Sequence, residues 1–205
     1  MVSTVQERWP ALFFPEEISK EFYRVTSKNL HETWNASLDK YTSRLIKLYQ
    51  ARKTAFGQDL EKLLNSLDEE TADIARHRRT TALRGLPIFV REDASEFFLK
   101  CMNTDPEEEV VGGVAVAILT VYDDDDGTES PPVTEINVIL EGAVIKHDLP
   151  DLAAAFAYLF GLMYAMDISY PEKMRYTFEA IQTIFSELGS RCSQRTRSLK
   201  EKLLL

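Results

Sequence analysis

The sequence predicts a mostly helical α+β protein, in which a long N-terminal helical arm or hairpin precedes a small antiparallel β-sheet packed by helices. Residues 16–56 contain neither proline nor glycine and carry apolar side chains at helical spacing. Two apolar, β-branched runs then flank a turn-rich acidic stretch, which is the pattern of a β-hairpin. Two helix-starting patterns follow. We therefore expect four regions, a lead-in, a helical arm, a compact α+β domain and a basic tail, over residues 1–15, 16–84, 85–190 and 191–205.

The helical arm carries a candidate self-association seam. Pro15 followed by two glutamates suits a helix start, because acidic groups favour the first turn. One continuous helix over residues 16–56 would be about 60 Å long, too long to be covered by one compact domain. The arm therefore either folds back as a hairpin or pairs with another chain. The coiled-coil-like spacing places the seam at Leu38, Tyr41, Leu45 and Leu48.

The middle of the chain is predicted as a helix, a short strand, a second helix and an acidic loop, over residues 67–84, 86–90, 92–102 and 103–109. Ser66 and Glu69 have the spacing of a capping box, which starts the first helix. Gly85 is expected to end it. In the second helix, Phe97, Phe98 and Cys101 are expected to face inward.

The hairpin and two further helices complete the domain. In the second strand, Ile136 and Val138 alternate with Glu135 and Asn137, so we expect one solvated face on the sheet. A helix over residues 149–166 is apolar on all sides and should lie at the centre of the fold. Ser169 and Glu172 repeat the capping-box pattern before an amphipathic helix that ends near residue 189. The basic tail can form a short final helix.

Composition excludes several classes of protein. With 205 residues, 44% hydrophobic and 28% charged, wholesale disorder is not expected. A net charge of −9 argues against a protein that wraps duplex DNA, which needs a strong positive field. Two cysteines far apart, without a CxxC, support neither a disulfide scaffold nor a zinc site, so we expect a cytoplasmic or nuclear protein. The longest apolar run, about 14 residues, is too short to cross a bilayer, so no membrane contact is expected.

No catalytic, cofactor-binding or metal-binding site is predicted, and the protein is not expected to be an enzyme. The aspartates at 123–126 precede Gly127, but placing this glycine at the sixth position of an EF-hand loop puts Tyr122 and Val133 at ligand positions. We expect a solvated loop there. The three histidines lie far apart, and neither GxGxxG nor a P-loop pattern occurs.

A cluster of arginines is the candidate for phosphate contacts, at Arg76, Arg78, Arg79 and Arg84. Arg76 and Arg79 share a helix face, but the next position along that face is Leu83, so the charged stripe is short. The favoured interpretation is that these arginines complement a helix C-terminus and bridge to nearby carboxylates.

Several phrases in the second half resemble a known family. They are the stretches at residues 85–93, 138–142 and 159–165, together with Phe97-Phe98 and Tyr170-Pro171. They are similar to the C-terminal region of multi-copy fish proteins labelled as similar to sterile-alpha-motif-domain-containing protein 3. The resemblance covers residues 80–190 and does not include the sterile alpha motif itself. It implies a C-terminal module of larger proteins that act by association.

These patterns together predict a non-catalytic protein-interaction or self-assembly module that binds protein and forms homo-oligomers. The alternative is a nucleic-acid-binding accessory protein that uses the arginine cluster at residues 76–84. Size measured at several concentrations separates a folded-back monomer from an oligomer.

Overall fold

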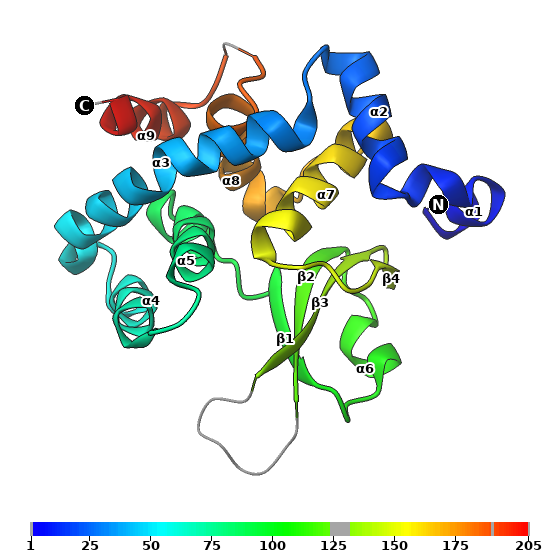
Figure 1. Ribbon diagram of the computed structural model, residues 1–205, viewed down its shortest axis with the longest axis horizontal. Helices are drawn as coiled ribbons and strands as arrows, with labels where there is room; N and C mark the ends of the chain where they lie inside the picture. The colour runs from blue at the N-terminus through cyan, green and yellow to red at the C-terminus, as the bar shows by residue number, and fades with distance from the viewer. Residues whose placement is uncertain (1, 124–131, 190, 205) are drawn as a thin grey trace. The chain divides into compact units, whose positions relative to one another are not determined.

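The computed structural model describes residues 2–123, 132–189 and 191–204. These residues form a mostly helical α+β protein with a small four-stranded sheet, which confirms the predicted fold class (Figure 1). The chain divides into two compact units, and both are discontinuous in sequence. Unit 1 combines Met1–Val25 with Ser95–Pro171, and unit 2 combines Thr26–Ala94 with Glu172–Leu205. This division does not follow the linear boundaries expected from the sequence, because each unit combines one segment from the first half of the chain with one from the second half.

The sheet of unit 1 has the strand order β1-β2-β3-β4, with bounds Phe98–Met102, Val116–Tyr122, Val133–Leu140 and Ala143–Lys146. The predicted hairpin is confirmed, since β2 and β3 pair antiparallel with Ile118 opposite Val138. The helix predicted over residues 92–102 is wrong, because residues 92–97 are turn and loop and β1 occupies the rest. There β1 pairs parallel with β2, so the sheet is mixed rather than purely antiparallel.

Helices cover both faces of this sheet (Figure 1). On one face, α7 (Leu152–Ala165) packs against β2 and β3, and its Phe156 ring contacts the Phe98 ring of β1. On the other face, Val111 of α6 (Glu107–Val111) packs with Leu119 and its neighbours. The expected central position of the apolar helix is confirmed by its burial, and its first turn is capped by Asp151, which accepts from Ala154 N–H at 2.7 Å.

The expected solvated face of β3 is corrected by Asn137, which is only 2% exposed. Its amide donates to Glu135 Oε2 at 3.0 Å, and its Oδ1 accepts from the backbone N–H of Asp148 at 3.1 Å. A buried amide is tolerated because its polar atoms are paired. The polar residue at position 137 therefore belongs to a buried hydrogen-bonded site and not to a solvent-exposed face of the sheet.

The N-terminal segment of unit 1 is helical and packs on α7. It comprises α1, a 3₁₀ turn and α2, over Val2–Arg8, Pro10–Phe13 and Pro15–Thr26. The Phe22 ring lies 5.9 Å from the Phe160 ring and 5.4 Å from the Tyr164 ring. Tyr158 Oη donates to the carbonyl of Phe13 at 2.8 Å, and burial raises the pKa of this phenol. The predicted lead-in is thus part of a core.

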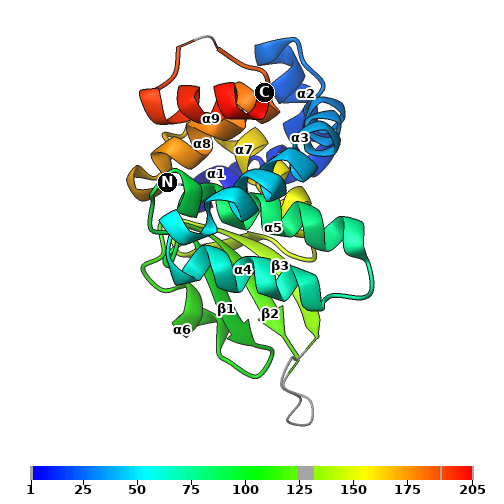
Figure 2. The ribbon, with the colours of Figure 1, turned by 90° about the vertical axis from the view of Figure 1, so that its left-hand side faces the viewer.

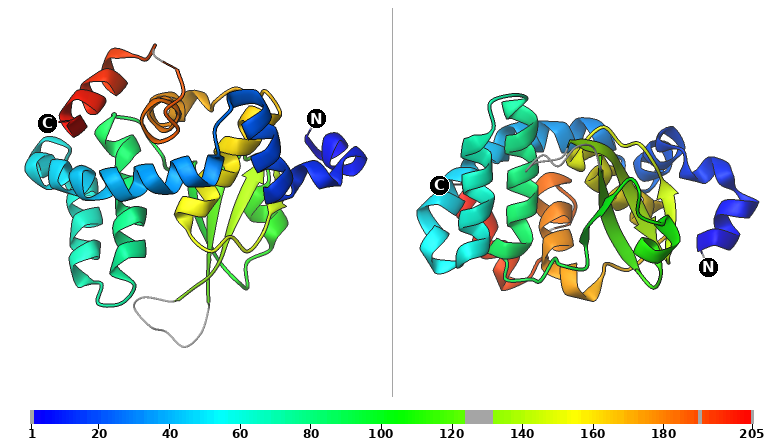
Figure 3. Two further views of the ribbon diagram at one scale, coloured as in Figure 1. Left: turned by 45° about the horizontal axis from the view of Figure 1, so that its top comes forward. Right: turned by 90° about the horizontal axis from the view of Figure 1, so that it is seen from below.

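Unit 2 is built from helices. They are α3 (Leu30–Arg52), α4 (Gln58–Glu69), α5 (Ile74–Phe89), α8 (Arg175–Ala180), a π-helical segment (Ile181–Phe185) and α9 (Gln194–Leu204). Asn29 caps α3 by accepting from Glu32 N–H at 3.1 Å. The α4 and α5 helices lie side by side and antiparallel (Figures 2 and 3). A single long arm is not confirmed, and the final helix expected in the tail is present as α9.

Helix α5 differs most from the prediction. Ser66 and Glu69 lie in the last turns of α4 rather than starting a helix, and α5 continues through Gly85 and Pro87 where a stop and a strand were predicted. Gly85 has a packing role instead, because a Cβ added there would clash with the Tyr49 ring of α3. Tyr49 is fully buried and donates its hydroxyl to the carbonyl of Ala82 at 2.8 Å.

Two glutamates cap the C-terminal helices of unit 2. Glu92 accepts from the backbone N–H groups of Tyr176 and Thr177 at 2.7 and 2.9 Å, which are free donors in the first turn of α8. Glu179 accepts from Ser193 N–H and Thr196 Oγ1, both at 2.7 Å, and so holds the start of α9. The capping box predicted at Ser169 is wrong, because Glu92 from a distant segment supplies that cap.

We expect Glu179→Gln to lower the free energy of unfolding at neutral pH by about 1–3 kcal/mol, because hydrogen bonds to a charged acceptor are lost. Burial alone would raise the pKa of Glu179, but hydrogen bonds from Ser193 and Thr196 outweigh it, so its pKa lies below that of an ordinary glutamate. This stabilisation is complete above the unfolded pKa of about 4.3 and is lost as pH falls through the folded pKa. Urea unfolding across this pH range measures the effect.

The matched control is Glu187→Gln, which removes an exposed ion pair with Lys28 and should cost less than about 1 kcal/mol. The Glu179→Gln curve should converge with that of the parent at low pH. A constant offset between the two curves at every pH would contradict the assigned role of the carboxylate.

Candidate functional site

The predicted self-association seam lies in the core of unit 2. Leu38, Tyr41 and Leu45 are 0%, 6% and 0% exposed, and Leu48 is half-buried. The Tyr41 ring meets the Phe185 ring edge-on at 6.2 Å. The expectation of an exposed seam is therefore corrected, because helices of the same unit cover these side chains. The alternative that the arm folds back describes the structure.

Arginines of the predicted phosphate cluster contact their own unit. Arg79 forms an ion pair with Asp39 of α3, and Arg78 Nη2 donates to Ser43 Oγ at 3.3 Å. Arg76 lies 3.9 Å from Asp73. Arg84 is half-buried in the same helix. These contacts agree with the interpretation that the arginines bridge to nearby polar groups, and the proposed phosphate contacts remain a prediction.

The opposite side of α3 carries a basic stripe that the sequence reasoning missed. Lys40, Arg44 and Lys47 are exposed, and their spacing of four and three residues places them on one side of the helix. None of the three has an ion-pair partner among the residues that the structure describes. We call these three residues the α3 stripe. The sequence could have revealed it, because these three basic residues recur at helical spacing on a different side of the helix from the apolar seam.

Neighbouring helices of unit 2 flank the α3 stripe on both sides. Arg44 Nη1 donates to the carbonyl of Leu203 at the end of α9 at 2.7 Å. On the other side, the hydrogen bond to Ser43 brings the guanidinium of Arg78 from α5 next to the stripe. The Lys40 ammonium lies 4.9 Å above the Tyr41 ring. The basic surface therefore belongs to packed helices rather than to a loop.

Charge is distributed very unevenly between the two units. Unit 1 contains 5 basic and 19 acidic residues, a net charge of −14, whereas unit 2 contains 19 basic and 14 acidic residues, a net charge of +5. The overall charge of −9 conceals this separation. An argument from the net charge of the whole chain therefore does not apply to unit 2 alone.

A short acidic segment stands out in unit 1. Asp105 and the three glutamates 107–109 are all exposed, and we call residues 105–109 the acidic segment. Asp105 Oδ2 accepts from the backbone N–H of Met102 at 2.7 Å, which fixes the turn before α6. Burial, and then the charges of Asp105 and Glu107, raise the pKa of the nearby Cys101 thiol. The segment thus produces a negative field at its edge of the sheet.

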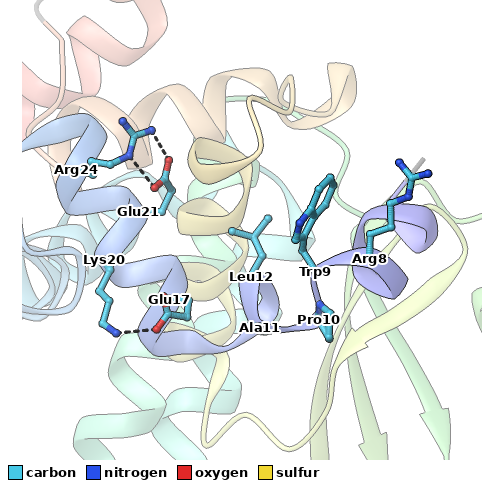
Figure 4. A pocket seen from close by; sticks show the side chains of 9 residues that line it. All are labelled: Arg8, Trp9, Pro10, Ala11, Leu12, Glu17, Lys20, Glu21 and Arg24. Carbon is cyan, nitrogen blue, oxygen red and sulfur yellow. Dashed lines mark hydrogen bonds and ion pairs between the residues drawn. The ribbon is translucent and has the colours of Figure 1, made fainter.

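Unit 1 also has an open hollow of about 520 Å³ beside its N-terminal helices (Figure 4). Its lining comprises residues 8–12 together with Glu17, Lys20, Glu21 and Arg24 of α2. The α2 side chains neutralise one another, since Lys20 pairs with Glu17 at 2.6 Å and Arg24 with Glu21 at 2.5 Å.

The other side of this hollow is aromatic and basic. The Trp9 indole is 59% exposed, and its side chain lies next to that of Leu12 (Figure 4). Arg8 has no ion-pair partner in the part of the chain that the structure describes. Tryptophan and arginine are enriched in the residues that dominate binding energy at protein interfaces. The hollow therefore has the composition of a small protein-contact site.

The structure provides no metal centre among its described residues, which contain no group of three or more His, Cys, Asp or Glu side chains placed to hold an ion. Asp123 accepts from the side-chain amide of Asn103 at 2.8 Å. The rest of the predicted aspartate turn, residues 124–126, lies outside the described residues, so the expectation of a solvated loop stays a prediction. Within the described ranges, no helix has both the length and the apolar character needed to span a membrane.

Comparison of the chain with protein-family models, with curated proteins and with solved structures finds no match. The resemblance to the fish protein family accordingly stays an expectation.

We expect Leu45→Ala to lower the free energy of unfolding by about 2–5 kcal/mol, because it leaves a cavity in a fully buried position. Leu48→Ala should cost clearly less, since Leu48 is half-buried. Urea unfolding followed by circular dichroism compares the two variants. Equal, small losses would mean that this side of α3 is not a core face and would restore the seam hypothesis.

Proposed function

We propose that the protein is a non-catalytic protein-interaction module that assembles with further copies of itself. The observation that carries this proposal is the separation of charge into a unit with a net charge of −14 and a unit with a net charge of +5. Surfaces of opposite sign on the same chain attract one another between copies and orient them as they approach.

The exposed positions of the charges support this proposal. The α3 stripe and the acidic segment each present several exposed side chains of one sign on regular structure. An ammonium or carboxylate that has no partner within the chain gains more from an intermolecular contact than one that must first leave an existing ion pair. The N-terminal hollow, with Trp9 and Arg8, adds an apolar contact of the kind that holds an encounter complex together.

Sedimentation equilibrium of the full chain at several protein concentrations tests self-assembly. At about 0.1 M salt, where the Debye length is about 10 Å, the mass should rise with concentration above the 23.4 kDa of one chain. At about 1 M salt, where the Debye length falls to about 3 Å, it should return towards that of one chain. A single-chain mass at every concentration and in both salts would refute the proposal.

A nucleic-acid-binding accessory role is the second candidate, and the positive charge of unit 2 favours it. Against it, Arg78 and Arg79 are already engaged with α3. We expect fluorescence anisotropy with single- and double-stranded oligonucleotides at physiological salt to show only non-specific dissociation constants, about 10⁻⁴–10⁻⁶ M. Sub-micromolar binding that is lost when Arg76, Arg78 and Arg79 are changed to Glu would establish this role instead.

A further inference from the structure

We infer that the α3 stripe of one copy binds the acidic segment of a second copy, so that the protein assembles through two surfaces of opposite charge. This inference rests on the proposed self-assembly and names the two surfaces that make the contact. It places Lys40 and Lys47 opposite carboxylates from residues 105–109 of the neighbouring copy.

The α3 stripe is suited to this contact because it is exposed, rigid and uncompensated. Lys40 and Lys47 lie about 10 Å apart along a helix of 23 residues, at 1.5 Å per residue. The other side of that helix is locked into the core of unit 2 through Leu38 and Leu45. The backbone under the two ammonium groups is therefore already ordered before binding, which lowers the entropy cost of the contact.

The acidic segment has matching properties. Its carboxylates are exposed, and the structure records no ion pair to any of them within the described ranges. Its position is fixed at one end by the hydrogen bond from Met102 N–H to Asp105. At the other end, Val110 and Val111 pack into the apolar cluster of the sheet. Its four carboxylates within five residues provide the negatively charged partners that Lys40 and Lys47 do not have within unit 2.

The second copy is the occupant that the charges favour. Among the described residues, the stripe has no ion-pair partner within unit 2 and the acidic segment has none within unit 1, and a second copy supplies the complementary charge to each. Because the two surfaces differ, a copy that has contributed its stripe still has an acidic segment to offer. It can offer it to the same neighbour, which closes a two-fold dimer, or to a third copy, which extends a ring or chain.

Charge-swap mixing tests the contact directly. The stripe variant carries Lys40→Glu and Lys47→Glu, and the acidic variant carries Glu107→Lys and Glu109→Lys. At about 0.1 M salt each variant alone should associate at least about tenfold more weakly than the parent, because like charges then face one another. Mixed in equal amounts, the two variants should form assemblies that contain both, because each surface of one variant then meets a surface of opposite charge on the other. The chain that carries all four changes should regain self-association.

The matched control is Arg52→Glu with Lys62→Glu, two exposed basic residues of unit 2 that lie outside the stripe. This control makes the same change in net charge as the stripe variant and should associate like the parent. Circular dichroism checks that each variant is folded, which we expect because all the changed side chains are exposed.

The outcomes separate the inference from the proposed function. If the parent associates and the stripe variant associates equally well, or if mixing the two variants gives no assembly that contains both, the inference is overturned and self-assembly stands. If the parent stays a single chain, both fall. If the parent stays a single chain but binds an oligonucleotide below micromolar concentration and the stripe variant does not, the stripe serves nucleic acid and the inference is overturned.

Discussion

The burial of one face of α3 is the constraint on which the organisation of unit 2 depends. Trp34, Leu38 and Leu45 are almost inaccessible to solvent, and α5, α9 and the π-helical segment pack against this helix. The side of a helix opposite its buried face is exposed to solvent, so burial of the apolar side also places Lys40 and Lys47 on the exposed side. The packing that buries the predicted apolar seam therefore also exposes the α3 stripe. The orientation of the helix about its axis determines both results.

Unit 1 meets a different constraint, which is the need to bury a helix that is apolar on every side. Helix α7 is covered on one side by the sheet and elsewhere by side chains of the N-terminal segment, including Phe22. The acidic residues of unit 1 are consequently left to its edges, such as the turn before α6 and the flanks of the sheet. The buried core determines where charged residues of unit 1 can lie but not their sign, so the separation of charge between the units is a separate property of the sequence.

Local patterns in the sequence predicted the hairpin, the buried helix α7 and the final helix α9, because in each case the nearest residues determine the structure. The predictions that failed concern elements whose structure depends on residues far away in the sequence. Gly85 was taken for a helix stop, but its lack of a side chain serves the Tyr49 ring on α3, which no local rule can anticipate. The cap of α8 comes from Glu92, far away in the chain, and the parallel pairing of β1 depends on β2. For the candidate site, the lysine spacing was visible, whereas the face it would occupy depended on tertiary packing.

An assembly held by exposed charges on ordered helices has properties that a leucine seam lacks. Exposed ion pairs contribute little individually, about 0–1 kcal/mol, so a contact built from a few of them is reversible and sensitive to ionic strength. Its orientation is nevertheless defined, because Lys40 and Lys47 stand on a helix that the core already holds. The apolar hollow around Trp9 is a means of increasing the lifetime of such a contact, since burial of an indole does not weaken in salt. Charge would then determine which surfaces meet, and apolar burial would determine how long they stay together.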